Sequence, residues 1–196
     1  QARAAGSTSS AAQTAGLGAW IATNDDFAGD GASPTGDGSD ARTDGTQRAF
    51  TEDMLKSVMS SVWTAGGNPS VLMVGAFNKQ KVSGFAGIAA QRYMAPADGP
   101  TTIIGAADVY MSDFGTLSVV PNRFQPTNNA GGADNNYNVF VLDPEYAAIN
   151  YLDEVQQKPL AETGHSMRTL IWCEYGLQID NEKAHGVIRD TTNLLT

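Results

Sequence analysis

Residues 50–69, FTEDMLKSVMSSVWTAGGNP, constrain the fold more than any other stretch of the sequence. Thr51 can cap the N-terminus of a helix, and the two acidic residues after it suit the positive end of the helix dipole. Apolar residues recur three to four positions apart, as on the buried face of a helix: Phe50, Met54, Leu55, Val58, Met59 and Val62. The segment therefore predicts an amphipathic helix that ends at Gly66 or Gly67.

Short apolar runs after this helix predict strands. SVLMVGAF (residues 70–77) is apolar almost throughout, as expected of a strand covered on both faces, and VFVL (139–142) predicts another strand that ends at Asp143-Pro144. A second helix is expected from Asn78. The C-terminal segment RTLIWCEYGLQIDNEKAHGVIRD predicts an extended strand, or a hairpin that turns near residues 181–183. Together these elements predict a mixed α+β domain and not a regular βαβ array.

The tripeptide Asp113-Phe114-Gly115 lies between two alternating segments and also occurs where protein kinases hold magnesium. A kinase also needs a glycine-rich loop, a lysine on a strand and a catalytic loop before this point, and none can be assembled here. The connector of a β-hairpin explains the tripeptide better, with Asp113 accepting from local amides and Gly115 adopting a positive φ. Pro121 should end the second strand.

Charge and cysteine content exclude several classes of partner. The chain has 196 residues, with 21 acidic against 12 basic residues and a net charge of -9, which opposes direct binding to nucleic acid. No apolar run approaches the roughly 20 residues of a membrane helix. The single cysteine, Cys173, excludes an internal disulfide, and its apolar setting LIWCEYGL predicts a buried, inert thiol in a reducing compartment.

No motif marks an active site, and no cofactor or metal is predicted. The residues that most resemble a ligand set, without the paired spacing of a metal site, are His165, Cys173, Glu174 and His185.

Residues 24–47 are rich in Asp and Gly and predict an exposed acidic loop. Their segment GDGSD partly matches one repeat of a calcium-binding β-roll, where several stacked copies are needed. A calcium-dependent extracellular binding module and an enzyme of unrecognised type therefore remain as alternatives.

Three stretches, in this order, resemble a known family: residues 44–87, then DVYMSDFGTLSVVPNRFQP (108–126), then 139–190. They are similar to the major capsid proteins of tailed bacteriophages, in the branch of Hong Kong 97-fold head proteins long catalogued as a domain of unknown function. The similarity runs from about Leu17 to Asp190. It implies a structural protein without catalytic activity, whose copies form hexameric and pentameric capsomers of an icosahedral shell around packaged DNA.

The resemblance also implies partners and a location. Scaffold, portal and decoration proteins would be further partners, and the DNA would be enclosed without specific binding. The subunit would be assembled in the cytoplasm of the bacterial host and reside in the virion.

The family's fold implies a division of the chain. It has a peripheral domain with a spine helix and an axial domain with a central sheet flanked by helices. Residues 1–23 would end the spine-helix region, 24–47 form the exposed loop, 48–165 form mainly the axial core with a hairpin at 108–121, and 166–196 hold late strands that return to the peripheral framework. The chain would be the C-terminal two thirds of a subunit, without its N-terminal arm and extended loop.

The residues that carry the resemblance are assigned structural roles. They are Asp113, Phe114, Gly115, Pro121, Asn122, Arg123, Asp143, Pro144 and Glu174. Phe114 should pack against this or a neighbouring subunit. Arg123 should make a charge-assisted bond to a carboxylate or a carbonyl, because a cation directly after an apolar strand needs a partner.

Overall fold

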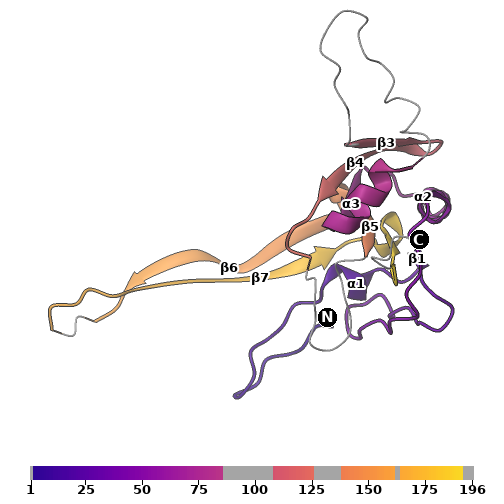
Figure 1. Cartoon of the computed structure of the whole chain (residues 1–196). Helices are drawn as coiled ribbons and strands as arrows, with labels where there is room; N and C mark the ends of the chain where they lie inside the picture. The colour runs from indigo at the N-terminus through magenta and orange to yellow at the C-terminus, as the bar shows by residue number, and fades with distance from the viewer. Residues whose placement is uncertain (1, 86–107, 126–137, 162–163, 192–196) are drawn as a thin grey trace, which may run out of the picture.

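A computed structural model describes residues 2–85, 108–125, 138–161 and 164–191 (Figure 1). Its elements in chain order are α1 (Leu17–Trp20), β1 (Asp25–Asp26), α2 (Glu52–Thr64), β2 (Val71–Val74), α3 (Ala76–Ser83), β3 (Val109–Ser112), β4 (Gly115–Pro121), β5 (Val139–Leu142), the 3-10 turn η3 (Pro144–Tyr146), β6 (Ala147–Pro159), β7 (Thr169–Ile179), the 3-10 turn η4 (Glu182–Ala184) and β8 (Gly186–Ile188). The predicted mixed α+β class is confirmed.

Six strands form a mixed central sheet in the order β1-β8-β5-β2-β4-β3. Strand β2 lies in its interior, parallel to β4 and antiparallel to β5. Leu72 and Val74 of β2 are fully buried, whereas Val71 and Met73 are half-buried. The strand predicted at residues 70–77 is therefore confirmed over four residues, with one face covered more completely than the other.

Helix α2 forms where the sequence predicts it. Thr51 Oγ1 accepts from the backbone N–H of Met54 at the N-terminus. At the other end Gly66 adopts a φ of 88°, and the N–H groups of Gly66 and Gly67 donate to the carbonyls of Trp63 and Val62, each at 3.0 Å. This pair of bonds is a Schellman motif, so glycine ends the helix for the conformational reason that the sequence suggests.

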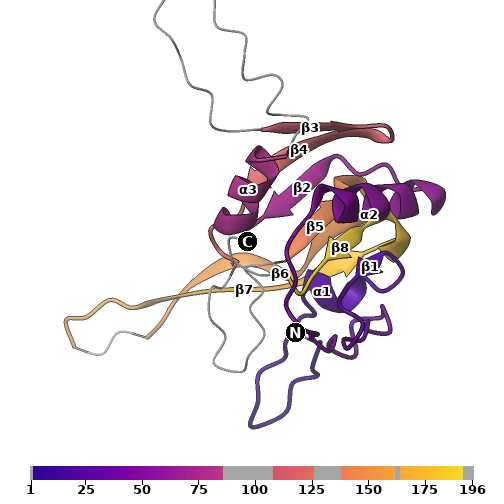
Figure 2. The same cartoon turned by 45° about the vertical axis from the view of Figure 1, so that its right-hand side comes forward.

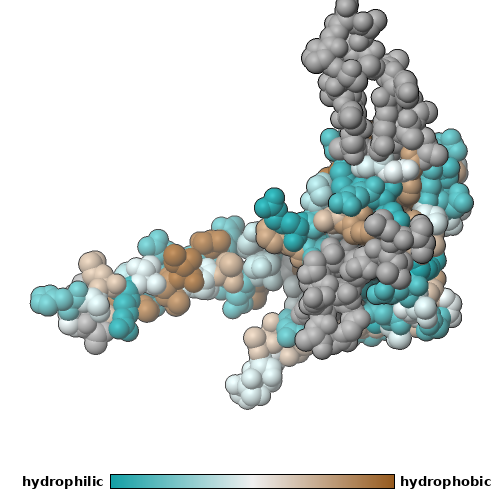
Figure 3. Space-filling view, in the orientation of Figure 1, coloured by the Kyte–Doolittle hydropathy of each residue, from teal (hydrophilic) through white to brown (hydrophobic). Residues whose placement is uncertain are grey.

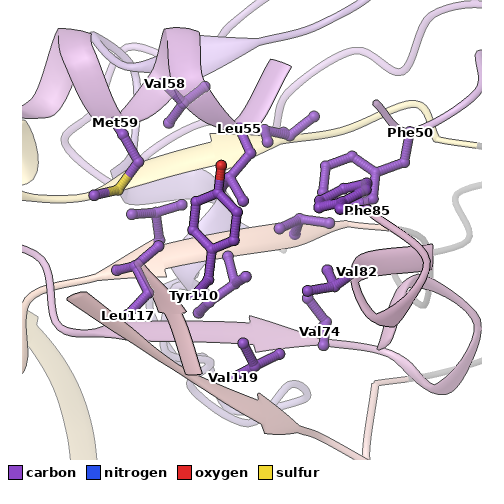
Figure 4. Close-up of a cluster of buried hydrophobic side chains, with 14 of the residues drawn as sticks. Phe50, Leu55, Val58, Met59, Val74, Val82, Phe85, Tyr110, Leu117 and Val119 are labelled. Carbon is purple, nitrogen blue, oxygen red and sulfur yellow. The ribbon is translucent and has the colours of Figure 1, made fainter. Parts of the chain in front are cut away.

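The main core lies between the sheet and the two longer helices (Figure 4). The buried side of α2 contributes Leu55, Val58, Met59 and Val62, and α3 adds Val82. A smaller cluster on the opposite face of the sheet joins Ile21, Phe140 and Val187. Because neighbouring residues of β5 point to opposite faces, the sheet connects both clusters.

Strands β6 and β7 form a separate two-stranded antiparallel sheet, called the ribbon below, that projects away from the central sheet (Figures 1 and 2). Its register is regular near the base, with Ile149 opposite Leu177 and Tyr151 opposite Tyr175. It shifts between Tyr151 and Asp153 and again between Asp153 and Gln156. The domain boundary that the sequence analysis expects between residues 165 and 166 falls between these two strands, with β6 before it and β7 after it.

The C-terminal segment differs in part from the predicted hairpin. It turns near residues 181–183 as expected, through η4. The strand after the turn does not pair with β7, however, because β7 pairs with β6 and β8 instead enters the central sheet beside β5. Burial explains this arrangement, since all three residues of β8 are buried.

The helix expected from Asn78 begins two residues earlier, at Ala76, and ends at Ser83, with Gly84 as its C-cap. Residues 86–107 and 126–137 lie outside the described residues. None of the helices in the described ranges is long and apolar enough to cross a membrane.

Candidate functional site

The connector at Asp113-Phe114-Gly115 is a β-hairpin turn. Strands β3 and β4 pair antiparallel up to Ser112 opposite Gly115, and Gly115 adopts a φ of 142° as expected. Ser112, and not Asp113, makes the local bonds: its Oγ donates to the Gly115 carbonyl at 2.9 Å and accepts from the Phe114 N–H at 3.2 Å. The expectation for Asp113 is thus wrong, because the serine hydroxyl can both donate and accept across this short turn.

Phe114 packs as predicted. Its ring is partly buried against the main core and lies 5.5 Å, between centroids, from the ring of Trp63 on α2. The hairpin turn is therefore fixed to the helix by an aromatic pair.

Nearby, the hydroxyl of Tyr110 donates to Glu52 at 3.1 Å, and burial together with the Glu52 charge raises the pKa of Tyr110 to about 12.

The segment after β4 corrects one prediction. Strand β4 ends at Pro121 as expected, and the Asn122 N–H continues its bonding by donating to the carbonyl of Val74 at 2.8 Å. The Asn122 carboxamide oxygen accepts from the Phe124 N–H at 2.9 Å. Arg123 is exposed and has no carboxylate or carbonyl partner within the described ranges, since it lies in this solvent-facing turn. The predicted charge-assisted bond of Arg123 is therefore wrong as far as the described residues are concerned.

Asp143 and Pro144 form the joint between the central sheet and the ribbon. The buried Asp143 carboxylate caps η3 by accepting from the Glu145 N–H, and it also accepts from the Asn68 N–H. The Asp143 N–H donates to Nδ1 of His185 at 3.2 Å, so this nitrogen is unprotonated and the imidazole is neutral. Burial lowers the pKa of His185 against the opposing effects of the Tyr146 backbone, Asp143 and Glu182.

Glu182 fixes the opposite side of this joint to the start of the chain. Its carboxylate accepts from the N–H groups of Ala22 and Thr23 and from the Thr23 hydroxyl. Burial alone would raise the pKa of Glu182, but these hydrogen bonds outweigh it and hold the pKa below its ordinary value. The base of the ribbon is thus anchored by two groups of hydrogen bonds, one at Asp143 and one at Glu182, to different parts of the chain.

The Asp/Gly-rich loop at residues 24–47 is tied to the domain. Arg189, directly after β8, is fully buried and pairs with Asp25 at 2.7 Å. Its Nη1 donates to the carbonyl of Thr43 at 2.8 Å, and its guanidinium lies 4.5 Å from the ring of Phe27. Asp190 accepts from the N–H groups of Ala28 and Gly45. Many loop residues are exposed, but this buried network holds both ends of the loop on the sheet.

Within the loop, the carboxylates bind the chain itself. Asp37 accepts from the Ser39 N–H and the Thr35 hydroxyl, and bonds from Ser39 and Thr35 lower its pKa to about 2. Asp40 also accepts from Thr35, and Asp30 accepts from Thr46. Among the described residues, no group of three or more His, Cys, Asp or Glu is placed to hold a metal ion.

The four residues that most resemble a ligand set are not brought together. His165 lies in the connector of the ribbon, Cys173 and Glu174 lie along β7, and His185 is buried at the base. Cys173 is exposed, so the prediction of a buried thiol is wrong. Its apolar neighbours alternate between the two faces of the ribbon, and the described chain leaves much of both faces open.

Sequence reasoning predicted an extended strand where β7 lies, but it missed β6 and the pairing of the two strands into the ribbon. An open groove of about 780 Å³ lies along it, lined among others by Ala12, Tyr151, Cys173 and Tyr175. The alternation of Ile149 and Tyr151 was a signal for β6, but two irregularities in the register break it after Tyr151. The prominent features of the described residues are a projecting ribbon and a tightly anchored loop.

Comparison with known proteins shows the family of the chain. The family model described as SU10 major capsid protein matches residues 1–192, and the chain belongs to that family. It is accordingly a structural protein and not an enzyme. No curated protein matches the chain.

Two solved structures are similar to this chain. The first, the holo-SrpI encapsulin complex from Synechococcus elongatus PCC 7942, shares 14% identity with a TM-score of 0.44, over 75% of this chain and 51% of that one. The second, a virus-like particle from Pyrococcus furiosus, shares 14% identity with a TM-score of 0.37, over 74% of this chain and 54% of that one. The chain thus spans about half the length of each.

Proposed function

We propose that this chain is the shell-forming subunit of a bacteriophage capsid. The observation that carries the proposal is the match of the major capsid protein family to residues 1–192, almost the whole chain. Copies would associate into hexameric and pentameric capsomers and close into an icosahedral shell, because a repeated contact between identical subunits can generate a closed assembly. The virion would be its final location, after assembly in the cytoplasm of the host.

We propose the Hong Kong 97 arrangement for the fold, with this chain as the C-terminal two thirds of the subunit. In place of the expected division between residues 165 and 166, we propose that the central sheet with α2 and α3, including β8, would be the axial domain. The ribbon, including β6, would belong to the β-structure of the peripheral domain. The supporting observation is that one core unites the sheet and helices while the ribbon forms a separate sheet. The residues that carry the resemblance would then have structural roles. Residues 113–115 would form a hairpin turn, 121–123 would end a strand, 143–144 would join the sheet to the ribbon, and Glu174 would lie in the ribbon.

The charge of the chain supports enclosure of DNA without specific binding. With a net charge of -9, the subunit repels phosphate on average, so packaged DNA would be retained by confinement. Scaffold, portal and decoration proteins would be its further partners. Neither alternative function gains support, since the loop carboxylates of the calcium hypothesis are occupied by backbone and hydroxyl donors.

Expression from the full-length gene, followed by sedimentation and negative-stain electron microscopy, tests the proposal. We expect closed particles or rings of five and six subunits. A chelator should leave both the particles and the melting temperature unchanged, because no calcium site is part of the proposal. A protein that sediments only as a monomer over a wide range of concentration and salt would contradict it.

A further inference from the structure

One hydrogen bond ties together the two connections between the ribbon and the central sheet. The chain enters the ribbon from β5 through Asp143 and η3, and it returns from β7 through η4 and His185 to β8. The Asp143 N–H donates to Nδ1 of His185 at 3.2 Å, so this bond links the entering connection to the returning one. Beyond its base the ribbon stands clear of the central sheet (Figure 3). We call these two connections the joint.

The imidazole of His185 sits in a tightly packed place. Its residue is fully buried, and the Asn24 amide donates to its carbonyl at 3.0 Å. Because Nδ1 accepts a hydrogen bond, the neutral ring carries its hydrogen on Nε2, and Nε2 has no hydrogen-bond partner among the described residues. The backbone beside the ring is close to its neighbours, since a Cβ built on Gly67 would lie 2.8 Å from Cα of Ala184.

Protonation of His185 is incompatible with its present bond. The proton must go to Nδ1, the nitrogen without a hydrogen. The Nδ1–H and the Asp143 N–H would then be two donors facing each other, and the bond of 3.2 Å between them would be lost. The imidazolium would also be a buried charge without an acceptor, which is unfavourable. The protonated ring therefore cannot keep the place that the neutral ring occupies.

The Asp143 carboxylate offers the protonated ring an acceptor. Its negative charge favours the imidazolium, and a bond between the two would be charge-assisted. At present this carboxylate accepts from the N–H of Glu145 at 3.1 Å and from the N–H of Asn68 at 3.3 Å. Turning toward the ring would remove the cap of η3 and the tie to Asn68. One set of hydrogen bonds would thus replace another, and the start of β6 would be released.

The other charged groups of the joint keep their charge in the pH range where histidine titrates. Glu182 of η4 also favours the imidazolium, and the charge of Lys183 beside it acts on Glu182. The pKa of Glu182 lies below its ordinary value of 4.5, because hydrogen bonds outweigh its burial, so it stays ionised between pH 7 and pH 5. Helix α2 and the segment before β1 meet this region through uncharged groups, Val62 and Asn24.

We infer that His185 is a pH-sensitive switch at the joint: the neutral ring holds the two connections together, and the protonated ring releases them while the central sheet stays folded. The release is local, because the main core lies between the central sheet and the helices and contains no residue of the ribbon. The inference goes beyond the proposed shell function and does not depend on it, since all the groups belong to one chain.

Native-state hydrogen exchange of the full-length gene product, followed by mass spectrometry, tests the inference. The backbone amides of residues 143–147 and 181–185 are compared with those of α2 at pH 7 and pH 5, after correction for the intrinsic rate at each pH. We expect the protection of the joint amides to fall by about threefold or more at pH 5, because the open joint takes up the proton more readily than the closed one. Low concentrations of urea should hardly change this exchange and should accelerate that of α2, since local opening exposes little surface.

Two results would overturn the inference in the unmodified protein. One is joint amides that keep their protection at pH 5. The other is joint amides that exchange at the same rate and with the same urea dependence as those of α2, which would mean that the joint opens only when the whole domain unfolds. Failure to form particles would overturn the proposed function and leave this inference standing.

Histidine variants assign the effect to one side chain. His185→Gln keeps an acceptor for the Asp143 N–H but does not titrate, so it should lose the pH effect on the joint. His165→Gln is the matched control, because His165 is exposed in the connector of the ribbon and should leave the effect unchanged. Equal responses of the two variants overturn the inference.

A titration of the unmodified protein keeps the inference testable if His185→Gln does not fold. Exchange of the imidazole C2 hydrogen, followed by mass spectrometry, reports the protonation of His185, with His165 as the internal reference. The pH at which His185 titrates should coincide with the pH at which the joint amides lose protection. A joint that opens at a pH where His185 does not change its protonation overturns the inference.

Discussion

At the scale of single residues, the most consequential group is the buried pair of Arg189 and Asp25. Both side chains are essentially inaccessible to solvent, with 0% and 1% exposed. Burial removes the hydration of both charges, which is unfavourable. The short distance between the two side chains offsets this cost, and the carbonyl of Thr43 and the ring of Phe27 also contact the guanidinium. Arg189 and its neighbour Asp190 hold the loop at residues 24–47, together with a second ion pair between Arg48 and Asp26.

Replacement of Arg189 by leucine should destabilise the domain strongly. The change leaves Asp25 buried without its partner, which costs about 3–5 kcal/mol in the free energy of unfolding. Lys56→Met is the control, since Lys56 forms an exposed pair with Glu52 and its loss should cost less than about 1 kcal/mol. Urea unfolding of the two variants measures both effects, and similar losses would contradict the role assigned to Arg189.

His185 should make stability depend on pH. Its folded-state pKa lies below the ordinary value of 6.5, so the unfolded chain takes up the proton more readily. Stability should be unaffected well above pH 6.5 and should fall as the pH drops from 6.5 through the folded-state pKa. His185→Gln keeps an acceptor for the Asp143 N–H but does not titrate, so its unfolding free energy should change less between pH 7 and pH 5. Parallel pH profiles for the two proteins would show that His185 is not responsible.

At the scale of elements, helix α2 lies unusually close to strand β8. A Cβ built on Gly186 would come within 2.4 Å of Val58 Cγ1 and 3.1 Å of Val62 Cγ2. The glycine therefore sets the distance between the helix and the sheet, since both valines are fully packed in the core.

Gly186→Ala should destabilise the domain by about 1–3 kcal/mol, because the added methyl forces the helix or the valines to move. Gly29→Ala is a matched control, since a Cβ there meets nothing within 4 Å. Thermal unfolding of both variants checks the prediction. A Gly186→Ala protein as stable as the control would mean that the approach of helix and strand is looser than described.

The elements that the sequence predicts well are those with complete local signals. Helix α2 has a cap, an apolar stripe and a terminating glycine, and the β3–β4 hairpin has alternation on both sides of Gly115. The ribbon has weaker signals, because the register of β6 shifts twice and its apolar face is not covered by its own domain. The prediction that Cys173 is buried fails on the same ribbon, because an apolar sequence neighbourhood predicts burial only where another part of the structure covers it.

The loop anchor was beyond sequence reasoning. Asp25 and Arg189 are 164 positions apart, and nothing near either residue indicates the other. The same is true of the contact between Asp143 and His185 at the base of the ribbon. Long-range polar contacts of this kind follow from the packing of the sheet, which fixes where strand ends meet.

At the scale of the whole molecule, the chain combines a well-packed domain with a ribbon whose apolar face is open. The domain has its own core between sheet and helices, so it can hold its shape as a unit. The ribbon buries little against that core and extends the molecule in one direction (Figures 1 and 2). A shell subunit needs both properties, a rigid body and an apolar surface for its neighbours.

The most direct measurement is a cryo-electron microscopy reconstruction of the particles formed by the full-length gene product. We expect a closed shell of repeated subunits in which the six-stranded sheet fits as one body. A protein that remains monomeric, or a shell in which this chain takes no part, would contradict it.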